Sequence, residues 1–190
     1  RQYVEAIPIR SIPFTTSAAH RVALGKQGRQ LYEAADPSGL VAFVETRLAA
    51  QPEESDVVHD LLAYLAEQMI DLNQRKQAEQ KRFLGWLEGA LHISEDSKGN
   101  TGLDALTGKT TLRGYLGDYQ KGQEAAPFSQ VEDVLFKNKA RLGISLSDAR
   151  FTARLRAEYE KSLATLLPIK ARLARTDALI DLIVYKLYGL

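Results

Sequence analysis

Residues 56–93 read DVVHDLLAYLAEQMIDLNQRKQAEQKRFLGWLEGALHI, a run with no proline and only two glycines, both near its end. Apolar side chains recur in it every three or four residues, in two groups: Val58, Leu61, Leu62, Leu65, Met69 and Leu72, then Phe83, Trp86, Leu87 and Leu91. This spacing predicts one amphipathic helix of roughly 57 Å, at about 1.5 Å per residue. Because one small core cannot cover that length, we expect its polar middle, residues 73–82, to cross solvent or to meet a polar partner.

A second helical pattern covers residues 147–188. Its apolar positions are Phe151, Leu155, Tyr159, Leu163, Leu166, Leu173, Ile180, Val184 and Leu187. Pro168 removes one backbone hydrogen bond and is expected to kink or split this helix. The two long patterns predict a mostly all-α fold, an elongated helical module built on a long antiparallel helix hairpin with coiled-coil-like apolar seams.

Capping signals predict where the helices begin. They are Ser17, Asp36 followed by Pro37, Ser55, the capping box Ser129–Glu132, and Ser145 or Ser147. The helix that follows Ser17 is expected to reach Ala35, and the one opened by the capping box to reach Arg141. Glycine is expected to limit residues 107–122 to a short helix.

The N-terminal residues 1–16 predict an extended strap, because a residue that precedes proline is pushed toward extended backbone. Two such sites occur here, Ile7-Pro8-Ile9 and Ile12-Pro13-Phe14, and residues 3–7 could add an edge strand. The domain organisation expected is a strap over residues 1–16, leaving an upstream domain, and a helical domain over residues 17–190. Since the chain begins with Arg1 rather than methionine, we expect it to be a piece of a longer polypeptide.

Composition excludes several classes of protein. The chain has no cysteine, which rules out disulfides and thiolate metal sites and fits a cytoplasmic location. No run approaches the ~18 apolar residues of a membrane span. The net charge is only +1, but residues 33–71 hold nine acids and one base, and residues 137–175 hold ten bases and three acids. Either these two segments pair with each other, or the protein has an acidic face and a basic face.

No complete active site is visible in the sequence. Gly108-Lys109-Thr110 resembles the end of a phosphate-binding loop, but the required earlier glycine is replaced by Leu103 and no strand precedes it. The three histidines, His20, His59 and His92, lack the spacing of metal ligands. We therefore expect no metal site in this chain.

The remaining candidates are cations that could bind phosphate groups. Those in the polar middle of the long helix are Arg75, Lys76, Lys81 and Arg82. A second set, Lys109, Arg113 and Lys121, lies near Tyr115 and Tyr119. Lysine and arginine bind the nucleic-acid backbone, and exposed tyrosines stack on bases or sugars. The alternative is an ordinary solvated helix surface.

Several segments occur in a familiar order. Ile7-Pro8-Ile9 and Ile12-Pro13-Phe14 are followed by LAEQMIDLNQRKQAEQKRFLGWLEGAL at 65–91, LTGKTTLRGYLGDYQKG at 106–122 and LRAEYEKSLATLLPIKARLARTDALIDLIVYKLYGL at 155–190. Together they resemble the C-terminal region of type IIG restriction-modification DNA adenine-N6 methyltransferases. The ending, residues 176–190, resembles the last helix of these enzymes and of their type I relatives, and the Ile-Pro strap resembles the exit from their target-recognition domain.

The resemblance implies a supporting role. The catalytic Asn-Pro-Pro-Tyr motif and the glycine-rich S-adenosylmethionine loop of the family do not occur in this chain. We therefore expect no catalysis and no cofactor here, and an S-adenosylmethionine-dependent methyltransferase in the parent polypeptide, with DNA cleavage left open. The expected partners are duplex DNA and the upstream methyltransferase and recognition domains. The alternative is a protein-interaction scaffold that docks a partner subunit or forms a homo-oligomer.

Overall fold

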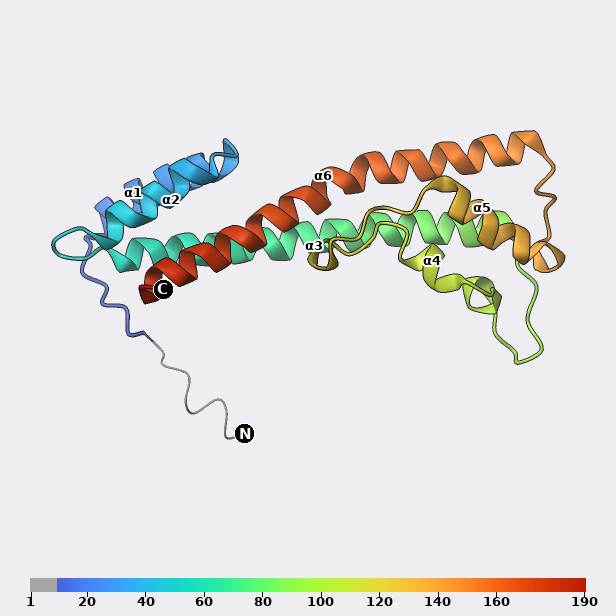
Figure 1. Cartoon of the computed structure of the whole chain (residues 1–190), viewed down its shortest axis with the longest axis horizontal. Coiled ribbons are helices and arrows are strands. Elements are labelled where there is room, and N and C mark those ends of the chain that lie inside the picture. The colour runs from blue at the N-terminus through green and yellow to red at the C-terminus, as the bar shows by residue number, and fades with distance from the viewer. Residues whose placement is uncertain (1–9) are drawn as a thin grey trace. The chain divides into compact units, whose positions relative to one another are not determined.

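The structure of the chain, a computed structural model, describes residues 10–190, and these are mostly helical (Figure 1). The α-helices are α1 (Ala18–Glu33), α2 (Pro37–Leu48), α3 (Ser55–Leu91), α4 (Lys109–Arg113), α5 (Phe128–Lys137) and α6 (Ala149–Tyr188). Short 3-10 helices are η1 (Gly102–Ala105), η2 (Tyr119–Lys121) and η3 (Lys139–Arg141). Within the described residues there is no strand, only an isolated bridge between Ile93 and Leu142. The prediction of an all-α fold is confirmed.

The described chain divides into two compact units. Unit 1 contains the residues up to Ile70 together with Arg175–Leu190, and unit 2 contains Asp71–Ala174. Both long helices therefore contribute one part to each unit. The strap motif Ile7-Pro8-Ile9 and the edge strand expected at residues 3–7 lie outside the described residues.

Unit 1 packs α1 and α2 against the first part of α3 and the last part of α6. Its buried core includes Tyr32, Leu40, Val44, Val58, Leu61, Leu65, Leu179 and Ile183. The Tyr32 ring meets Tyr64 edge-on at 5.8 Å, and the Tyr32 hydroxyl bonds the Thr176 hydroxyl at 2.8 Å. Near the start of α3, by contrast, Arg10 links Glu53 to the carbonyl of Leu187. Since later residues of α6 lie beside earlier residues of α3, the two segments run antiparallel in this unit.

Unit 2 is built on an aromatic cluster. Phe83 of α3 lies 5.0 Å from the Tyr115 ring and 5.8 Å from the Tyr159 ring of α6, and Phe128 of α5 lies 5.5 Å from Tyr159. Arg82 of α3 pairs with Glu158 of α6. Such offset and edge-on aromatic pairs stabilise a core beyond their buried area. The cluster fixes the position of α4 and the loops around it, which carry three of the seven candidate phosphate-binding residues.

The predicted helix starts are confirmed at Ser17 and Asp36. The Ser17 hydroxyl accepts a hydrogen bond from the His20 amide at 3.4 Å, and the Asp36 carboxylate accepts one from the Gly39 amide at 2.8 Å. Both bonds satisfy amide groups that the first turn of a helix leaves unpaired. Helices α1 and α2 follow as predicted, although α1 ends at Glu33.

The other predicted caps are wrong, because the serines named for them make no capping hydrogen bond within the described residues. Helix α3 begins at Ser55 itself, whose hydroxyl is buried without a hydrogen-bond partner in residues 10–190. Helix α5 begins at Phe128, with Pro127 in the cap position and no side-chain capping bond, so Ser129 already lies inside the helix. Helix α5 also ends at Lys137 rather than Arg141. The amide of Arg150 at the start of α6 is bonded by Asp148, not by Ser145 or Ser147.

Helix α6 continues through Pro168 from Ala149 to Tyr188. Proline removes one amide donor from the helix, but Leu166 and Ile169 on either side are buried in unit 2. Their burial offsets the lost hydrogen bond. The prediction that Pro168 could split the helix is therefore wrong.

Candidate nucleic-acid interface

The polar middle of α3 lies in unit 2, and most of its cations already have partners. Arg75 is exposed and lies 3.6 Å from the Asp71 carboxylate. The ammonium group of Lys76 donates to the side-chain oxygen of Asn73 at 2.9 Å. Lys81 is exposed, and no ion pair or hydrogen bond found within residues 10–190 involves its ammonium group. Of the cations in this segment, Lys81 is the best placed to meet an external anion.

Arg82 is committed to the protein itself. Its guanidinium donates two hydrogen bonds to Glu79, both at 2.8 Å, and one to Glu158 at 2.9 Å. Hydrogen bonds to Glu79 and then to Glu158 raise the pKa of Arg82 above its usual range. In return, the bond from Arg82 lowers the pKa of Glu79, with a smaller contribution from the Ser162 hydroxyl. Arg82 therefore joins α3 to α6 within unit 2, and its guanidinium has little capacity left for phosphate.

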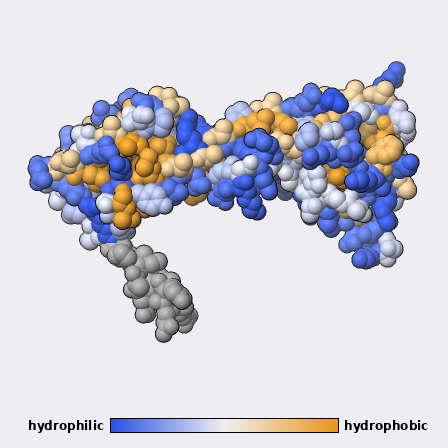
Figure 2. All heavy atoms as spheres, in the orientation of Figure 1, coloured by the Kyte–Doolittle hydropathy of each residue, from blue (hydrophilic) through white to orange (hydrophobic). Residues whose placement is uncertain are grey.

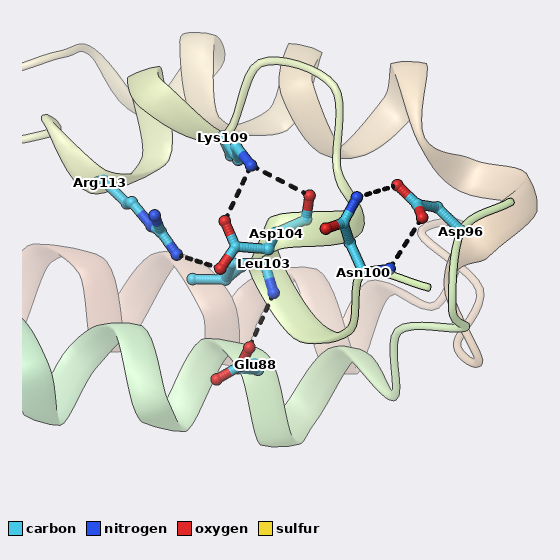
Figure 3. Close-up of polar contacts among 7 residues, drawn as sticks. All are labelled: Glu88, Asp96, Asn100, Leu103, Asp104, Lys109 and Arg113. Atoms are coloured by element: carbon cyan, nitrogen blue, oxygen red, sulfur yellow. Dashed lines mark hydrogen bonds and ion pairs between the residues drawn. The ribbon is translucent and has the colours of Figure 1, made fainter. Parts of the chain in front are cut away.

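Lys109 and Arg113 share one carboxylate (Figure 3). The ammonium group of Lys109 lies 2.8 Å from one oxygen of Asp104, and Arg113 donates to the other oxygen at 2.9 Å. These two bonds, that from Lys109 first, lower the pKa of Asp104. Two cations on one carboxylate leave a net positive charge at an exposed site, so this cluster can still attract an anion.

The loop that carries Asp104 is fixed from both sides (Figure 3). Glu88 of α3 accepts a hydrogen bond from the Leu103 amide at 2.8 Å. Gly102 has a φ of +56°, and a Cβ there would lie 1.5 Å from a Glu88 carboxylate oxygen, so glycine is favoured at this position. On the other side, Asp96 accepts hydrogen bonds from Asn100, whose side-chain bond is the main cause of an Asp96 pKa of about 2.

The two tyrosines differ from the prediction. Tyr115 is fully buried, its hydroxyl bonds Ser162 at 2.7 Å, and burial raises its pKa to about 12. It is therefore a core residue and cannot stack on a base. Tyr119 is half-buried and lines a cavity of about 310 Å³ beside Lys170, whose ammonium group bonds two backbone carbonyls. Lys121 is exposed, 3.6 Å from Asp118.

The phosphate-loop-like segment and the histidines lie in ordinary surroundings. Gly108-Lys109-Thr110 follows a 3-10 helix rather than a strand, and α4 spans only five residues. His20 and His59 lie beside Glu54 and Asp60, at 3.3 and 3.2 Å. No group of three or more histidine, aspartate and glutamate side chains in the described part of the chain could hold a metal ion.

The acidic segment pairs with cations that lie close to it in unit 1. Glu45 pairs with Lys186, Glu53 with Arg10, Glu54 with Arg47, and Asp60 with Arg21. None of these four cations belongs to residues 137–175. These four pairs therefore do not join the acidic segment to the basic one.

Sequence reasoning missed a group of cations on α1. Arg21, Lys26 and Arg29 line a cavity of about 310 Å³ between α1 and α3. No carboxylate found within residues 10–190 pairs with Lys26 or Arg29. The signal available in the sequence was the absence of acidic residues from Ala18 to Tyr32, next to a segment rich in acids.

Comparisons of the chain with protein-family models, curated proteins and solved structures find no match.

None of the helices within residues 10–190 combines the length and the apolar character needed to cross a membrane. On the face drawn in Figure 2, hydrophobic side chains form patches on a largely hydrophilic surface. The chemistry that the cations and the apolar patches offer is binding of anions and of apolar groups.

Proposed function

We propose that this chain is a non-catalytic C-terminal helical module of a restriction-modification DNA adenine-N6 methyltransferase. Its role would be to hold the upstream recognition domain in position and to support DNA by contacts to phosphates. The proposal rests on the resemblance of residues 65–91, 106–122 and 155–190 to that family. The helical architecture and the surface cations are compatible with it.

The observation that carries the supporting role is the attachment of residues 10–16 to unit 1. The Arg10 amide bonds the Tyr188 hydroxyl at 3.3 Å, and its guanidinium bonds Glu53 and the Leu187 carbonyl. Six residues later, Thr16 is bonded to Asp56 through its amide and its hydroxyl. Because residues 10–16 are attached to unit 1 at both ends, they would give an upstream domain a defined exit point, as a brace for that domain requires.

Contact with DNA would come from cations that the fold leaves available. Lys81 has no partner within residues 10–190, and Lys109 and Arg113 share one carboxylate. Because each phosphate contact releases bound counterions, the affinity should fall steeply as salt rises. Weak binding without sequence preference is expected, since no element here resembles a motif that reads bases.

The experiment is to measure the binding of the chain to a fluorescent duplex of about 20 base pairs, by anisotropy, between about 50 and 200 mM salt. We expect weak binding with a steep salt dependence, further weakened by Lys81→Glu. Glu67→Lys is the control, an exposed position on α3 in unit 1 where the charge change has the opposite sign. Binding that is undetectable or independent of salt would contradict DNA contact.

A second candidate function, docking of a protein partner, is favoured by an apolar surface on unit 1. Leu182 and Tyr185 of α6 are 38% and 54% exposed. Leu182 lines a cavity of about 350 Å³ together with Pro37 and Val41 of α2. Sedimentation of the chain without DNA tests this function: a defined oligomer that Tyr185→Glu dissociates would support it, and a monomer would count against self-association.

A further inference from the structure

The cavity between α1 and α3 in unit 1, which we call the α1 groove, is lined by Arg21, Val22, Gly25, Lys26, Arg29, Asp60 and Leu61. We propose that the α1 groove binds a phosphate group, with the backbone phosphodiester of duplex DNA as its source. The inference deepens the proposed function and rests on it for the identity of the source. Its cations, Arg21, Lys26 and Arg29, are not among the seven candidates predicted from the sequence.

The cations of the α1 groove are held in place but not neutralised. The guanidinium of Arg29 lies 4.9 Å from the centre of the Tyr64 ring, which orients the group, and no hydrogen bond found within residues 10–190 uses its N–H donors. No carboxylate within the described residues pairs with Lys26. The two residues are three apart on α1, so their side chains project from the same side of the helix.

The one acid in the groove is already compensated. Asp60 lies 2.9 Å from Nε of Arg21, which leaves the terminal N–H groups of Arg21 for another acceptor. The same guanidinium lies 5.0 Å from the Phe14 ring of the strap. The groove therefore carries an excess of positive charge. Its Lys26 and Arg29 are more available than Arg82, Lys109 or Arg113, which are bound to carboxylates of unit 2.

Gly25 keeps the groove open. A Cβ at Gly25 would meet no atom within 4 Å, whereas a Cβ at Gly28, one turn later, would lie 3.2 Å from the Phe43 ring. Close packing therefore explains glycine at 28 but not at 25, although glycine inside a helix lowers its stability. The cavity volume lies at the lower end of the range for ligand sites, which suits a small anionic group.

The test compares three variants of the 190-residue chain in the DNA-binding measurement. Lys26→Ala with Arg29→Ala removes two phosphate contacts, so the rise in Kd between about 50 and 200 mM salt should become about tenfold smaller. Gly25→Leu fills the groove without changing charge and favours the helix, so binding should weaken while the melting temperature does not fall. Lys98→Ala removes an exposed cation from unit 2 and should leave Kd nearly unchanged.

A second probe separates the failure of this inference from the failure of the proposed function. Pyrophosphate is titrated into the chain while the amide resonances of residues 21–29 are followed by NMR. If DNA binds the native chain and the groove variants equally well, with the same salt dependence, the inference of a phosphate site in the α1 groove is overturned and the proposed function stands. If DNA does not bind, the pyrophosphate titration decides. Shifts of these resonances that are lost in Gly25→Leu would support the α1 groove as a site for free phosphate compounds. The absence of such shifts would overturn it.

Discussion

Thr16 is bonded twice to the carboxylate of Asp56, through its amide at 2.9 Å and through its hydroxyl at 2.7 Å. The Asp56 carboxylate also accepts the Val57 amide at 2.9 Å, and the residue is fully buried. The Asp56 side chain thus holds Thr16 against the first turn of α3. Asp56→Ala should lower the free energy of unfolding by about 2–4 kcal/mol, since it removes several hydrogen bonds to a charged acceptor. Urea unfolding measures this change.

Asp71→Ala is the matched control for that variant. Asp71 is exposed and its partner Arg75 lies 3.6 Å away, so its loss should cost less than about 1 kcal/mol. Hydrogen exchange adds a local measurement, because the Thr16 amide should lose protection in Asp56→Ala. Retained protection of that amide would show that Asp56 does not hold the strap.

The same carboxylate predicts a dependence of stability on pH. Burial by itself raises the pKa of Asp56, but the bonds from Thr16, the Val57 amide and the charge of Arg21 outweigh it, and the pKa falls below the usual 3.8. A depressed pKa gives stability that is present above the unfolded pKa. It should be lost as the pH falls from about 4 through the lower pKa of the folded state. Unfolding curves of the native chain and Asp56→Ala should converge over this range, and a constant difference would contradict the assignment.

The bond between the hydroxyls of Tyr115 and Ser162 predicts an asymmetric pair of variants. Ser162→Ala leaves the buried Tyr115 hydroxyl without a partner and should lower the free energy of unfolding by about 1–3 kcal/mol. Tyr115→Phe should cost less, because Ser162 keeps its hydrogen bond to Glu79. Denaturation of both single variants and the double variant measures their coupling. Strictly additive losses would show that the two hydroxyls do not interact.

Asp104 restrains two cations, so its removal should strengthen binding to DNA. Asp104→Ala frees Lys109 and Arg113, and each additional phosphate contact steepens the logarithmic salt dependence by about 0.9. Asp133→Ala removes the same charge from α5, where no cation within the described residues pairs with it. Anisotropy measurements should show a larger gain for Asp104→Ala. Equal gains would mean that only the total charge matters.

Much of the fold could be predicted from the sequence because helical spacing is a local property. The limits of α3 and α6 lie within two residues of those expected. The capping residues at helix starts were harder to predict, since several polar side chains near a helix start compete for the same amide groups. At the start of α3, packing decides whether Ser55 or Asp56 makes the hydrogen bonds. The burial of Tyr115 could not be foreseen, because Phe83 and Tyr159 reach it from distant parts of the chain.

The candidate site was less predictable than the fold. The seven cations were chosen by residue type, but an ion pair depends on what lies nearby in space. Some partners were local, such as Glu79 for Arg82 and Asp71 for Arg75, and could have been found from helical spacing along the chain. The α1 groove could not, because it forms only when α1 packs against α3.

The central claim is the proposal that this helical module supports a DNA adenine-N6 methyltransferase domain of the same polypeptide. Sequencing the coding region upstream of the codon for Arg1 tests it most directly. We predict an Asn-Pro-Pro-Tyr motif a few hundred codons upstream, preceded by a glycine-rich S-adenosylmethionine loop and followed by a recognition domain that leads into Ile7-Pro8-Ile9. A reading frame that starts at this codon, or an upstream region without that motif, would contradict the claim.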